Sequence, residues 1–167
     1  PRHLRFVERD EARTAFPEVS DRACAGRPGY VKLADRWWDV LLADLEPSRG
    51  GASALFHLAY EEDGRIDGYV LYRIRRDTLV VVDLMAATEN AHAGLWRFCF
   101  DVDLIAITEA PGRPIDDPLP WMLADPRRLR RSTRDAMWLR LVDVSAALSA
   151  RRYARDGTLV LDVRDAL

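Results

Sequence analysis

The sequence is poor in the residues that carry disulfide, metal and membrane chemistry. Its 167 residues include two cysteines, Cys24 and Cys99, and no CxxC pair, which argues against a disulfide framework and for a reducing compartment, the cytoplasm. The three histidines stand far apart, and none belongs to HExxH or to another spacing of metal ligands. No apolar run reaches the roughly 18 residues of a membrane span, and no signal-peptide pattern occurs. We therefore expect no metal site and no membrane segment.

An excess of one charge is also missing. The 25 basic and 27 acidic residues leave a formal net charge of −2, which excludes a general affinity for nucleic acid or anionic membranes. Nearly all the basic residues are arginines, because Lys32 is the only lysine. The chain begins with Pro1 rather than Met, so we expect a piece of a longer polypeptide.

What is present is the apolar patterning of a mixed α and β domain. Hydrophobic residues make up 49% of the chain, as in ordinary globular proteins. Alternating or continuous apolar runs predict strands, and apolar residues at helical spacing predict helices. The strands are expected over residues 3–7, 54–60, 66–74, 79–87 and 104–108, and the helices over 8–26, 33–45 and 88–103.

The connections between these elements predict the sheet topology. The Asp63-Gly64 turn signal and the short link at 75–78 favour an antiparallel meander of three strands. The strand-helix-strand unit over 79–108 favours parallel pairing of its two strands. A proline-rich segment over 109–133 reads as an ordered but irregular connector. Beyond it, "AMWLRLVDVSAALSARRY" (136–153) resembles the opening of another domain, with a strand and a helix, and a further strand follows the Asp156-Gly157 turn.

Four segments give the chain a family resemblance. In order they are "GYVLYRI", "DLMAATENAHAGLWRFCFDVDLI", "DDPLPWMLADPRR" and "MWLRLVDVSAALSARRY". They resemble the middle and later part of the Eis-like (enhanced intracellular survival) acetyltransferases, and the element order is similar to the GCN5-related acetyltransferase fold. This implies an α+β sandwich, a mixed sheet with flanking helices. Residues 1–132 would form the second, degenerate acetyltransferase domain, and 133–167 the beginning of a sterol-carrier-like domain, truncated here.

The resemblance also implies a function for the longer protein. Such an enzyme transfers an acetyl group from acetyl-CoA to amines of cationic small molecules, aminoglycosides in particular, and forms homo-oligomers. Its catalytic groups, a tyrosine of the first domain and the terminal carboxylate of the whole chain, have no counterpart here. We therefore assign no catalytic residue to this chain and expect it to be inactive alone.

The segment "AATENAHAGLW" bears on cofactor binding. Active members of the family place glycines before the helix that follows the fourth strand, so that backbone N–H groups reach the cofactor phosphates. Here no glycine precedes the helix, Glu89 stands where phosphates would lie, and Gly94 comes too late. We therefore expect this domain not to bind acetyl-CoA, and we assign no cofactor-binding residue.

Four residues are candidates for the wall of a substrate cleft. Trp37 and Trp38 are adjacent aromatic residues on one expected helix, and the alternative to a cleft role is core packing of one and exposure of the other. Asp116 and Asp117 suit a cationic amine, and their alternative is a turn between Pro114 and Pro118.

Other side chains are assigned to packing or to the surface. His57 and His92 are interpreted as packing or surface residues, Cys99 as core, and Cys24 as a candidate for exposure.

Two further functions stay open at this point. One alternative is a freestanding module for apolar ligands or a structural and oligomerisation domain, although some thirty residues after Thr133 are too few to enclose a ligand pocket. The other alternative is a stand-alone acetyltransferase, against which the missing glycine loop argues.

Overall fold

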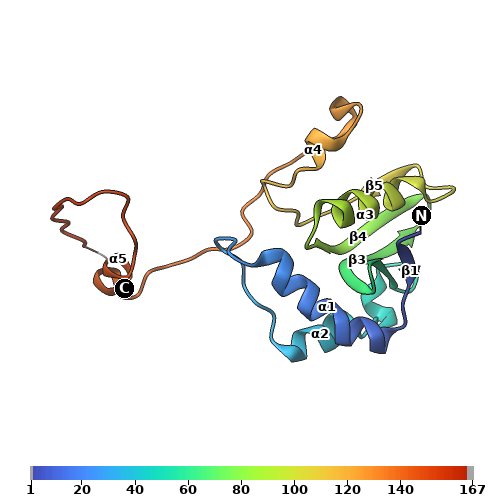
Figure 1. Ribbon diagram of the computed structural model, residues 1–167, viewed down its shortest axis with the longest axis horizontal. Coiled ribbons are helices and arrows are strands. Elements are labelled where there is room, and N and C mark those ends of the chain that lie inside the picture. Colours follow the sequence, from blue (N-terminus) through green and yellow to red (C-terminus); the bar gives the residue numbers. More distant parts are fainter. Residues whose placement is uncertain (1, 165–167) are drawn as a thin grey trace. The chain divides into compact units, whose positions relative to one another are not determined.

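The computed structural model describes residues 2–164, and its chain divides into two compact units, Pro1–Leu129 and Arg130–Leu167. Figure 1 shows the elements of each unit in chain order. The first unit contains a five-stranded sheet, and the second contains one short helix.

The sheet of the first unit has the strand order β1-β2-β3-β4-β5. The first four strands pair antiparallel, and β4 pairs parallel with β5, so the predicted meander and the predicted parallel pair are both confirmed. Asp63 and Gly64 join β2 to β3 with φ of +52° and +76°, the left-handed pair that a tight hairpin requires. The strands are β1 Leu4–Phe6, β2 Phe56–Glu62, β3 Arg65–Arg75, β4 Thr78–Ala86 and β5 Ile107–Glu109.

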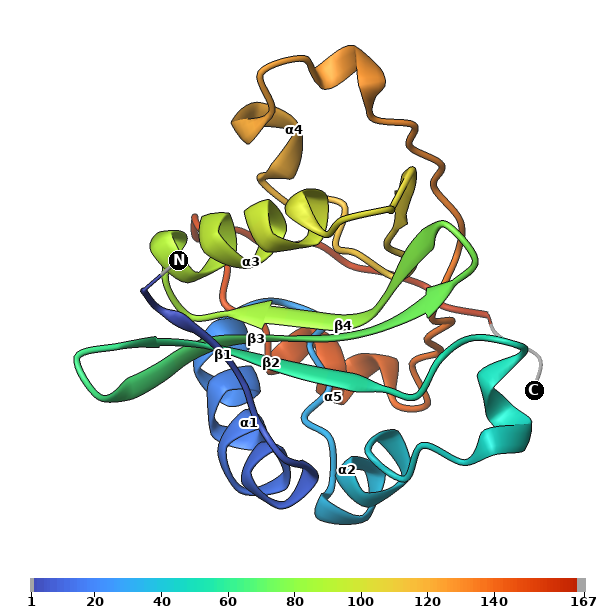
Figure 2. The same ribbon diagram turned by 90° about the vertical axis from the view of Figure 1, so that its right-hand side faces the viewer.

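Helices cover the two faces of this sheet. Figure 2 shows α3 on one face and α1 with α2 on the other. Two cores result. One lies under α3 and includes Leu95, and the other lies under α1 and includes Phe16. The strand β3 is buried on both faces, which explains its nearly continuous apolar sequence. The helices of this unit are α1 Arg9–Cys24, α2 Asp35–Leu41, α3 Glu89–Asp101 and α4 Leu119–Met122, with 3₁₀ turns η1 Glu46–Arg49 and η2 Pro126–Arg128.

The first helix lies within the expected span 8–26 and contains a proline. It runs unbroken through Pro17, although a proline in a helix interior ordinarily breaks or kinks the helix. Phe16 and Val19 on either side of this proline are buried, and Phe16 stacks on Tyr69 of β3 with ring centroids 4.3 Å apart. Packing of this face outweighs the local cost of the missing backbone N–H.

The last strand of the sheet is short. It pairs only with Thr78, Leu79 and Val80, the first residues of β4, so the second half of β4 has no strand partner on that side. A register shift between β3 and β4 leaves Val82 as an extra residue in β4 at the same point. Residues 110–118, here called the connector, follow β5, and the Arg113 side chain reaches this open edge of β4.

The second unit corrects one expectation. The segments predicted as strands near 137–142 and 158–163 form no strand in the described residues, and only the helix, α5 Val144–Ser149, is present. Asp143 caps that helix by accepting a hydrogen bond from the Ala146 N–H (2.8 Å). A strand needs a partner for its backbone groups, and a segment of this length supplies too few strands for a stable sheet.

Candidate functional site

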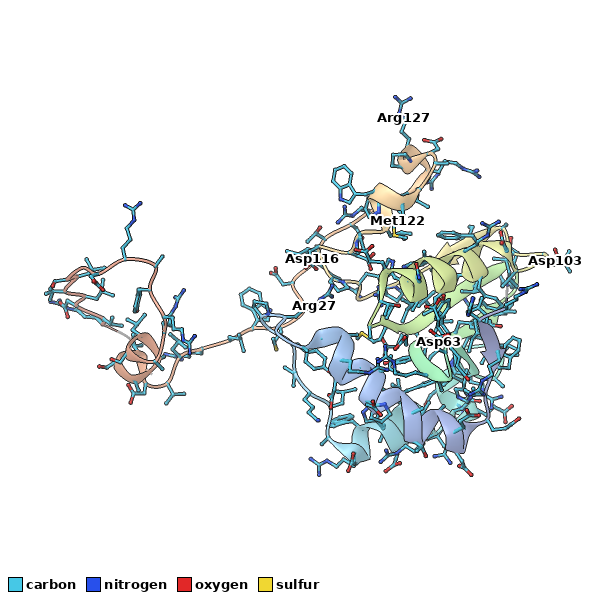
Figure 3. All side chains as sticks on the ribbon, in the orientation of Figure 1. Arg27, Asp63, Asp103, Asp116, Met122 and Arg127 are labelled. Carbon is cyan, nitrogen blue, oxygen red and sulfur yellow. The ribbon has the colours of Figure 1, made fainter. Side chains whose placement is uncertain are left out.

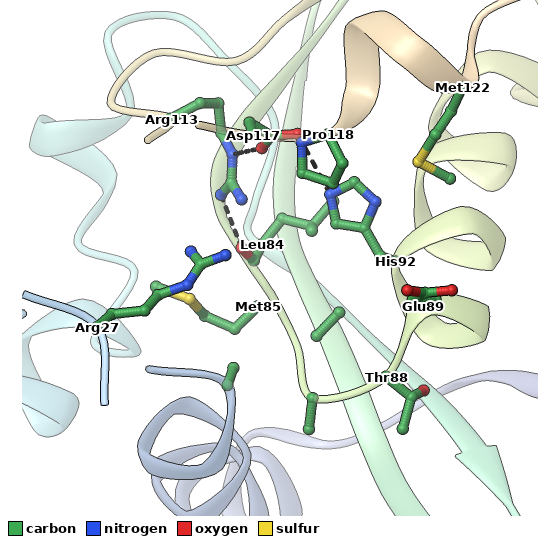
Figure 4. Close-up of a pocket in the computed structure, with 13 residues that line it drawn as sticks. Arg27, Leu84, Met85, Thr88, Glu89, His92, Arg113, Asp117, Pro118 and Met122 are labelled. Carbon is green, nitrogen blue, oxygen red and sulfur yellow. Dashed lines mark hydrogen bonds and ion pairs between the residues drawn. The ribbon is translucent and has the colours of Figure 1, made fainter. Parts of the chain in front are cut away.

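A cavity of about 510 Å³ opens where β4 ends and α3 begins. The second half of β4, the first turn of α3, the end of α1 and the connector after β5 all contribute to its wall (Figure 4). Its lining residues are Ala23, Arg27, Leu84, Met85, Ala86, Ala87, Thr88, Glu89, His92, Arg113, Asp117, Pro118 and Met122. The cavity therefore lies at the position where the family resemblance places a cofactor.

The connector is fixed to the open edge of β4 by one arginine. Arg113 Nη1 donates a hydrogen bond to the Leu84 carbonyl oxygen (2.7 Å), at a position where β5 no longer pairs with β4. Arg113 Nε also donates to Asp117 Oδ2 (3.1 Å), so the guanidinium joins the strand to the connector. A backbone acceptor that the sheet leaves open is thus satisfied by a side chain of this chain.

Asp117 is the centre of a buried polar cluster. Its carboxylate accepts hydrogen bonds from Arg113 and from the Leu119 N–H (2.9 Å), and it lies 3.3 Å from His92 Nε2. Burial opposes its ionisation, but the nearby His92 and the hydrogen bonds from Leu119 and Arg113 outweigh burial and hold the pKa of this carboxyl well below its usual range. Asp117 is therefore ionised throughout the neutral and mildly acidic range.

The first turn of α3 forms another wall of the cavity. Thr88 caps the helix by accepting a hydrogen bond from the Ala91 N–H (3.2 Å), and Glu89 is the first helical residue, with an exposed side chain. A carboxylate here occupies the positive end of the helix dipole. Arg27, which follows α1, also lines this cavity (Figures 3 and 4). The walls therefore carry both signs of charge.

The four predicted cleft residues take different positions. Trp38 lies in the core at 2% exposure with its ring edge-on to Tyr69, which is the core-packing alternative, and Trp37 is 54% exposed. Asp116 is exposed on the connector, whereas the adjacent Asp117 is 9% exposed and lines the cavity. The alternative prediction, a turn between Pro114 and Pro118, is partly right for Asp117, because its side chain accepts a hydrogen bond from the Leu119 N–H. The structure thus brings only Asp117 to this cavity, and the cleft role of the four residues stays a prediction.

Two residues of the site were not singled out by the sequence. Arg113 lies in a proline-rich segment whose path through the structure cannot be predicted from the neighbouring residues. His92 was interpreted as a packing or surface residue. The available signal was the HAGLW spacing, which places His92 and Trp96 one turn apart on α3. Trp96 Nε1 donates a hydrogen bond to His92 Nε2 (3.1 Å).

The cysteines carry no reactive chemistry here. Cys24 is 6% exposed, with its Sγ 3.8 Å from Met85 Sδ, so the expectation of an exposed thiol was wrong, because the end of α1 packs onto β4. Burial raises the pKa of Cys24, and it raises the pKa of Cys99 to about 12. Both thiols therefore stay protonated at neutral pH.

The described residues contain neither a cluster of metal ligands nor a membrane-spanning helix. Over residues 2–164, no group of three or more histidine, cysteine, aspartate or glutamate side chains is placed to hold a metal ion. In the same part of the chain, every helix is too short or too polar to cross a membrane.

Comparison with known proteins identifies the family. Residues 29–141 match the acetyltransferase (GNAT) domain. The chain belongs to this family. The crystal structure of Eis1 from Mycobacterium abscessus superposes with a TM-score of 0.61 at 31% identity, covering 89% of this chain and 38% of that one. The mixed sheet and its flanking helices are therefore the GNAT fold that the element order predicted.

Relatives in sequence are longer than this chain. An N-acetyltransferase of Streptomyces avermitilis is 37% identical over 171 residues, covering 98% of this chain and 42% of that protein. The N-acetyltransferase Eis of Mycobacterium tuberculosis is 36% identical over 169 residues, covering 97% of this chain and 40% of that protein. The chain thus spans about two fifths of the relatives it matches.

Proposed function

We propose that this chain is the central part of an Eis-like N-acetyltransferase. Two observations support the proposal, namely the identity of about one third with the Eis relatives over nearly the whole chain and the share of their length that it spans. The whole protein would transfer the acetyl group of acetyl-CoA to an amine, breaking a thioester C–S bond and forming an amide C–N bond. Its acceptor would be a cationic small molecule of the aminoglycoside class.

We further propose that this domain supports the reaction without performing it. The observation that carries this proposal is the start of α3, where Glu89 takes the place of a phosphate-binding loop and no glycine lies between β4 and the helix. A carboxylate at the helix N-terminus repels the pyrophosphate that such a terminus otherwise attracts. The residues present therefore do not fit acetyl-CoA, and we derive no chemical step through it in this domain.

The connector adds a second argument. Arg113 already occupies the Leu84 carbonyl on the open edge of β4, so an extended ligand would have to displace it from both Leu84 and Asp117. Losing a buried charge-assisted pair costs several kcal/mol, roughly 3, unless the ligand replaces both bonds. The domain would then serve as scaffold, as one wall of a substrate cleft and as a contact between subunits.

Isothermal titration of this chain with acetyl-CoA, and with coenzyme A as the matched ligand, tests the proposal. We expect no saturable heat from either ligand while circular dichroism shows a folded chain. Saturable micromolar binding of acetyl-CoA would contradict the scaffold proposal and make the domain a candidate enzyme.

An assay of the longer polypeptide tests the other part of the proposal separately. Release of coenzyme A thiol in the presence of an aminoglycoside is expected from the longer protein and not from this chain. If the longer protein acetylates no amine, the proposed activity is wrong, whatever the titration of this chain shows.

A further inference from the structure

One ring nitrogen of His92 has two neighbours with opposite requirements. Nε2 lies 3.1 Å from Trp96 Nε1 and 3.3 Å from Asp117 Oδ1. An indole N–H only donates, so the nitrogen must be unprotonated to accept from Trp96. An ionised carboxylate only accepts, so the same nitrogen must carry a proton to bond Asp117. The two bonds therefore cannot form at the same time, because one needs a bare Nε2 and the other needs a protonated Nε2.

We propose that His92 is a proton-dependent latch between α3 and the connector. In the neutral state, Nδ1 carries the proton and Nε2 accepts from Trp96, within α3. In the protonated state, a proton from solvent adds to Nε2, which donates to Asp117 and gives up the Trp96 bond. Uptake of one proton thus exchanges a bond inside α3 for an ion pair from α3 to the connector.

The buried donor of Trp96 decides which neutral form is present. Trp96 is 3% exposed, so its indole N–H needs an acceptor, and His92 Nε2 is the one the structure gives it. Asp117 does not depend on His92 in the same way, because Arg113 and Leu119 already donate to it. The neutral imidazole therefore serves Trp96 and keeps its proton on Nδ1, which is buried and has no hydrogen-bond partner in the described residues.

The charges around His92 come from every element that lines this cavity. Glu89 lies three residues before it on α3, Asp117 and Arg113 lie on the connector, and Arg27 follows α1. The walls near His92 therefore carry two carboxylates and two guanidiniums. On β4, Asp83 accepts a hydrogen bond from Tyr69.

The latch acts on the cavity through the connector. Asp117 is joined to Arg113, and Arg113 is joined to the Leu84 carbonyl of β4 (Figure 4). Protonation of His92 would therefore fasten α3, the connector and the open edge of β4 in one continuous set of bonds. Loss of the proton would release the connector from α3 while leaving it on β4.

A nuclear magnetic resonance titration of the 167-residue chain from pH 8 to pH 5 tests the latch, since histidine side chains change charge in this range. The probes are the ring nitrogens of His92 and the indole N–H of Trp96, assigned with Trp96→Phe. We expect the Nδ1–H tautomer at pH 8 and an indole resonance that moves with the same midpoint as the imidazole. His92→Gln, whose amide oxygen accepts from Trp96 at every pH, is expected to abolish the movement, whereas His3→Gln at the far edge of the sheet leaves it unchanged.

Hydrogen exchange gives a second readout that a purely structural histidine would not change. After correction for the intrinsic pH dependence, the Leu119 amide is expected to exchange roughly tenfold more slowly at pH 5.5 than at pH 7.5 as the charge-assisted bond forms. His92→Gln should remove this difference. The latch is wrong if the indole stays fixed while His92 titrates, if the Nε2–H tautomer dominates at pH 8, or if His92 keeps one charge from pH 8 to pH 5.

Discussion

Asp83 shows how a single residue can oppose the stability of its own core. Tyr69 donates a hydrogen bond to Asp83 Oδ2 (2.6 Å) beside the stacked ring of Phe16. Burial raises the pKa of Asp83, an effect that the bond from Tyr69 and the charge of Arg113 only partly offset. The folded pKa of Asp83 lies above its unfolded value near 4. The protonated carboxyl therefore contributes its full stability to the fold below about pH 4, and this contribution is lost as the pH rises through the folded pKa.

We therefore predict that Asp83→Asn stabilises the chain at pH 7. The amide oxygen still accepts from Tyr69, and the cost of a buried charge disappears, so the free energy of unfolding should rise by about 1 kcal/mol. The gain should shrink as the pH falls toward 4. Urea denaturation at several pH values measures it, and Asp103→Asn on the exposed loop after α3 is the matched control (Figure 3). A loss of stability at pH 7 would show that the ionised form is the favoured one.

Gly94 is required by a close approach rather than by a phosphate loop. A Cβ at this position would lie 2.8 Å from Cε2 of Tyr60, a ring that is 6% exposed and stacks on His3. Gly94→Ala should destabilise the chain by about 1–2 kcal/mol, since overpacking outweighs the gain of about 1 kcal/mol in helix propensity. In a Tyr60→Leu background the same change should become stabilising. Equal effects in both backgrounds, measured by thermal unfolding, would rule out this contact as the cause.

At the scale of elements, one ion pair ties α1 to β3. Arg22 Nη1 donates to Asp67 Oδ1 (2.6 Å), and Arg65 binds the same oxygen, while the Asp67 side chain is 5% exposed. Burial opposes ionisation here, but the bonds from Arg65 and Arg22 outweigh it and lower the pKa of Asp67. Because the folded pKa is depressed, the stabilisation is present above the unfolded value near 4 and is lost as the pH falls through the folded pKa.

Asp67→Asn is therefore expected to cost about 2 kcal/mol at neutral pH, a value reduced by the partial exposure of both arginines. The difference from the parent chain should vanish in acid. Asp101→Asn, in the exposed pair with Arg97, is the control and should change stability by less than about 0.5 kcal/mol. Chemical denaturation at pH 7 and at successively lower pH values below 3.5 measures both variants, because the difference disappears only once the pH falls below the lowered folded pKa of Asp67. A difference that persists in acid would mean that the carboxylate charge is not its source.

Local sequence patterns correctly predicted the helices and strands that have an apolar face packed into a core. The meander from β2 to β4 and the helix α3 follow from alternation, from the Asp63-Gly64 turn and from a Thr88 cap, all of which are local. The site depended on non-local contacts. Arg113 reaches Leu84 across 29 positions of sequence, and only the shortness of β5 makes that carbonyl available. Neither the Arg113–Leu84 contact nor the short length of β5 can be predicted from the residues around Arg113.

The predicted strands of the second unit failed for the same physical reason. Alternation near 137–142 and 158–163 describes segments able to pair, but pairing also requires neighbouring strands. Within the described residues these segments find none, and large side chains such as Trp138 and Val160 are exposed. The alternating pattern therefore marks segments that are able to form strands, but the 38-residue unit lacks the partner strands that they need.

At the scale of the whole molecule, the two units should differ in resistance to proteolysis. Unit Pro1–Leu129 has two cores and a sheet, whereas Arg130–Leu167 has only the short helix α5 in its described part. Local opening is easiest where few apolar contacts are buried. Limited trypsin digestion should thus remove the second unit first, with early cuts after Arg134, Arg151 and Arg152, while Arg22 in α1 stays protected. Mass spectrometry of the early fragments measures the order.

The same digestion of a longer polypeptide tests whether residues 133–167 begin a further domain. If the sterol-carrier-like prediction is right, later parts of that polypeptide supply the strands that the segments near 137–142 and 158–163 lack, and their backbone groups become paired. Cuts after Arg151 and Arg152 should then slow by at least about tenfold relative to this chain, as expected when cleavage requires opening of a folded unit. Cleavage after Arg134, near the start of the second unit, should slow less. Unchanged rates at Arg151 and Arg152 would mean that this segment remains a linker in the longer protein, and residues 133–167 would then need another explanation for their apolar alternation.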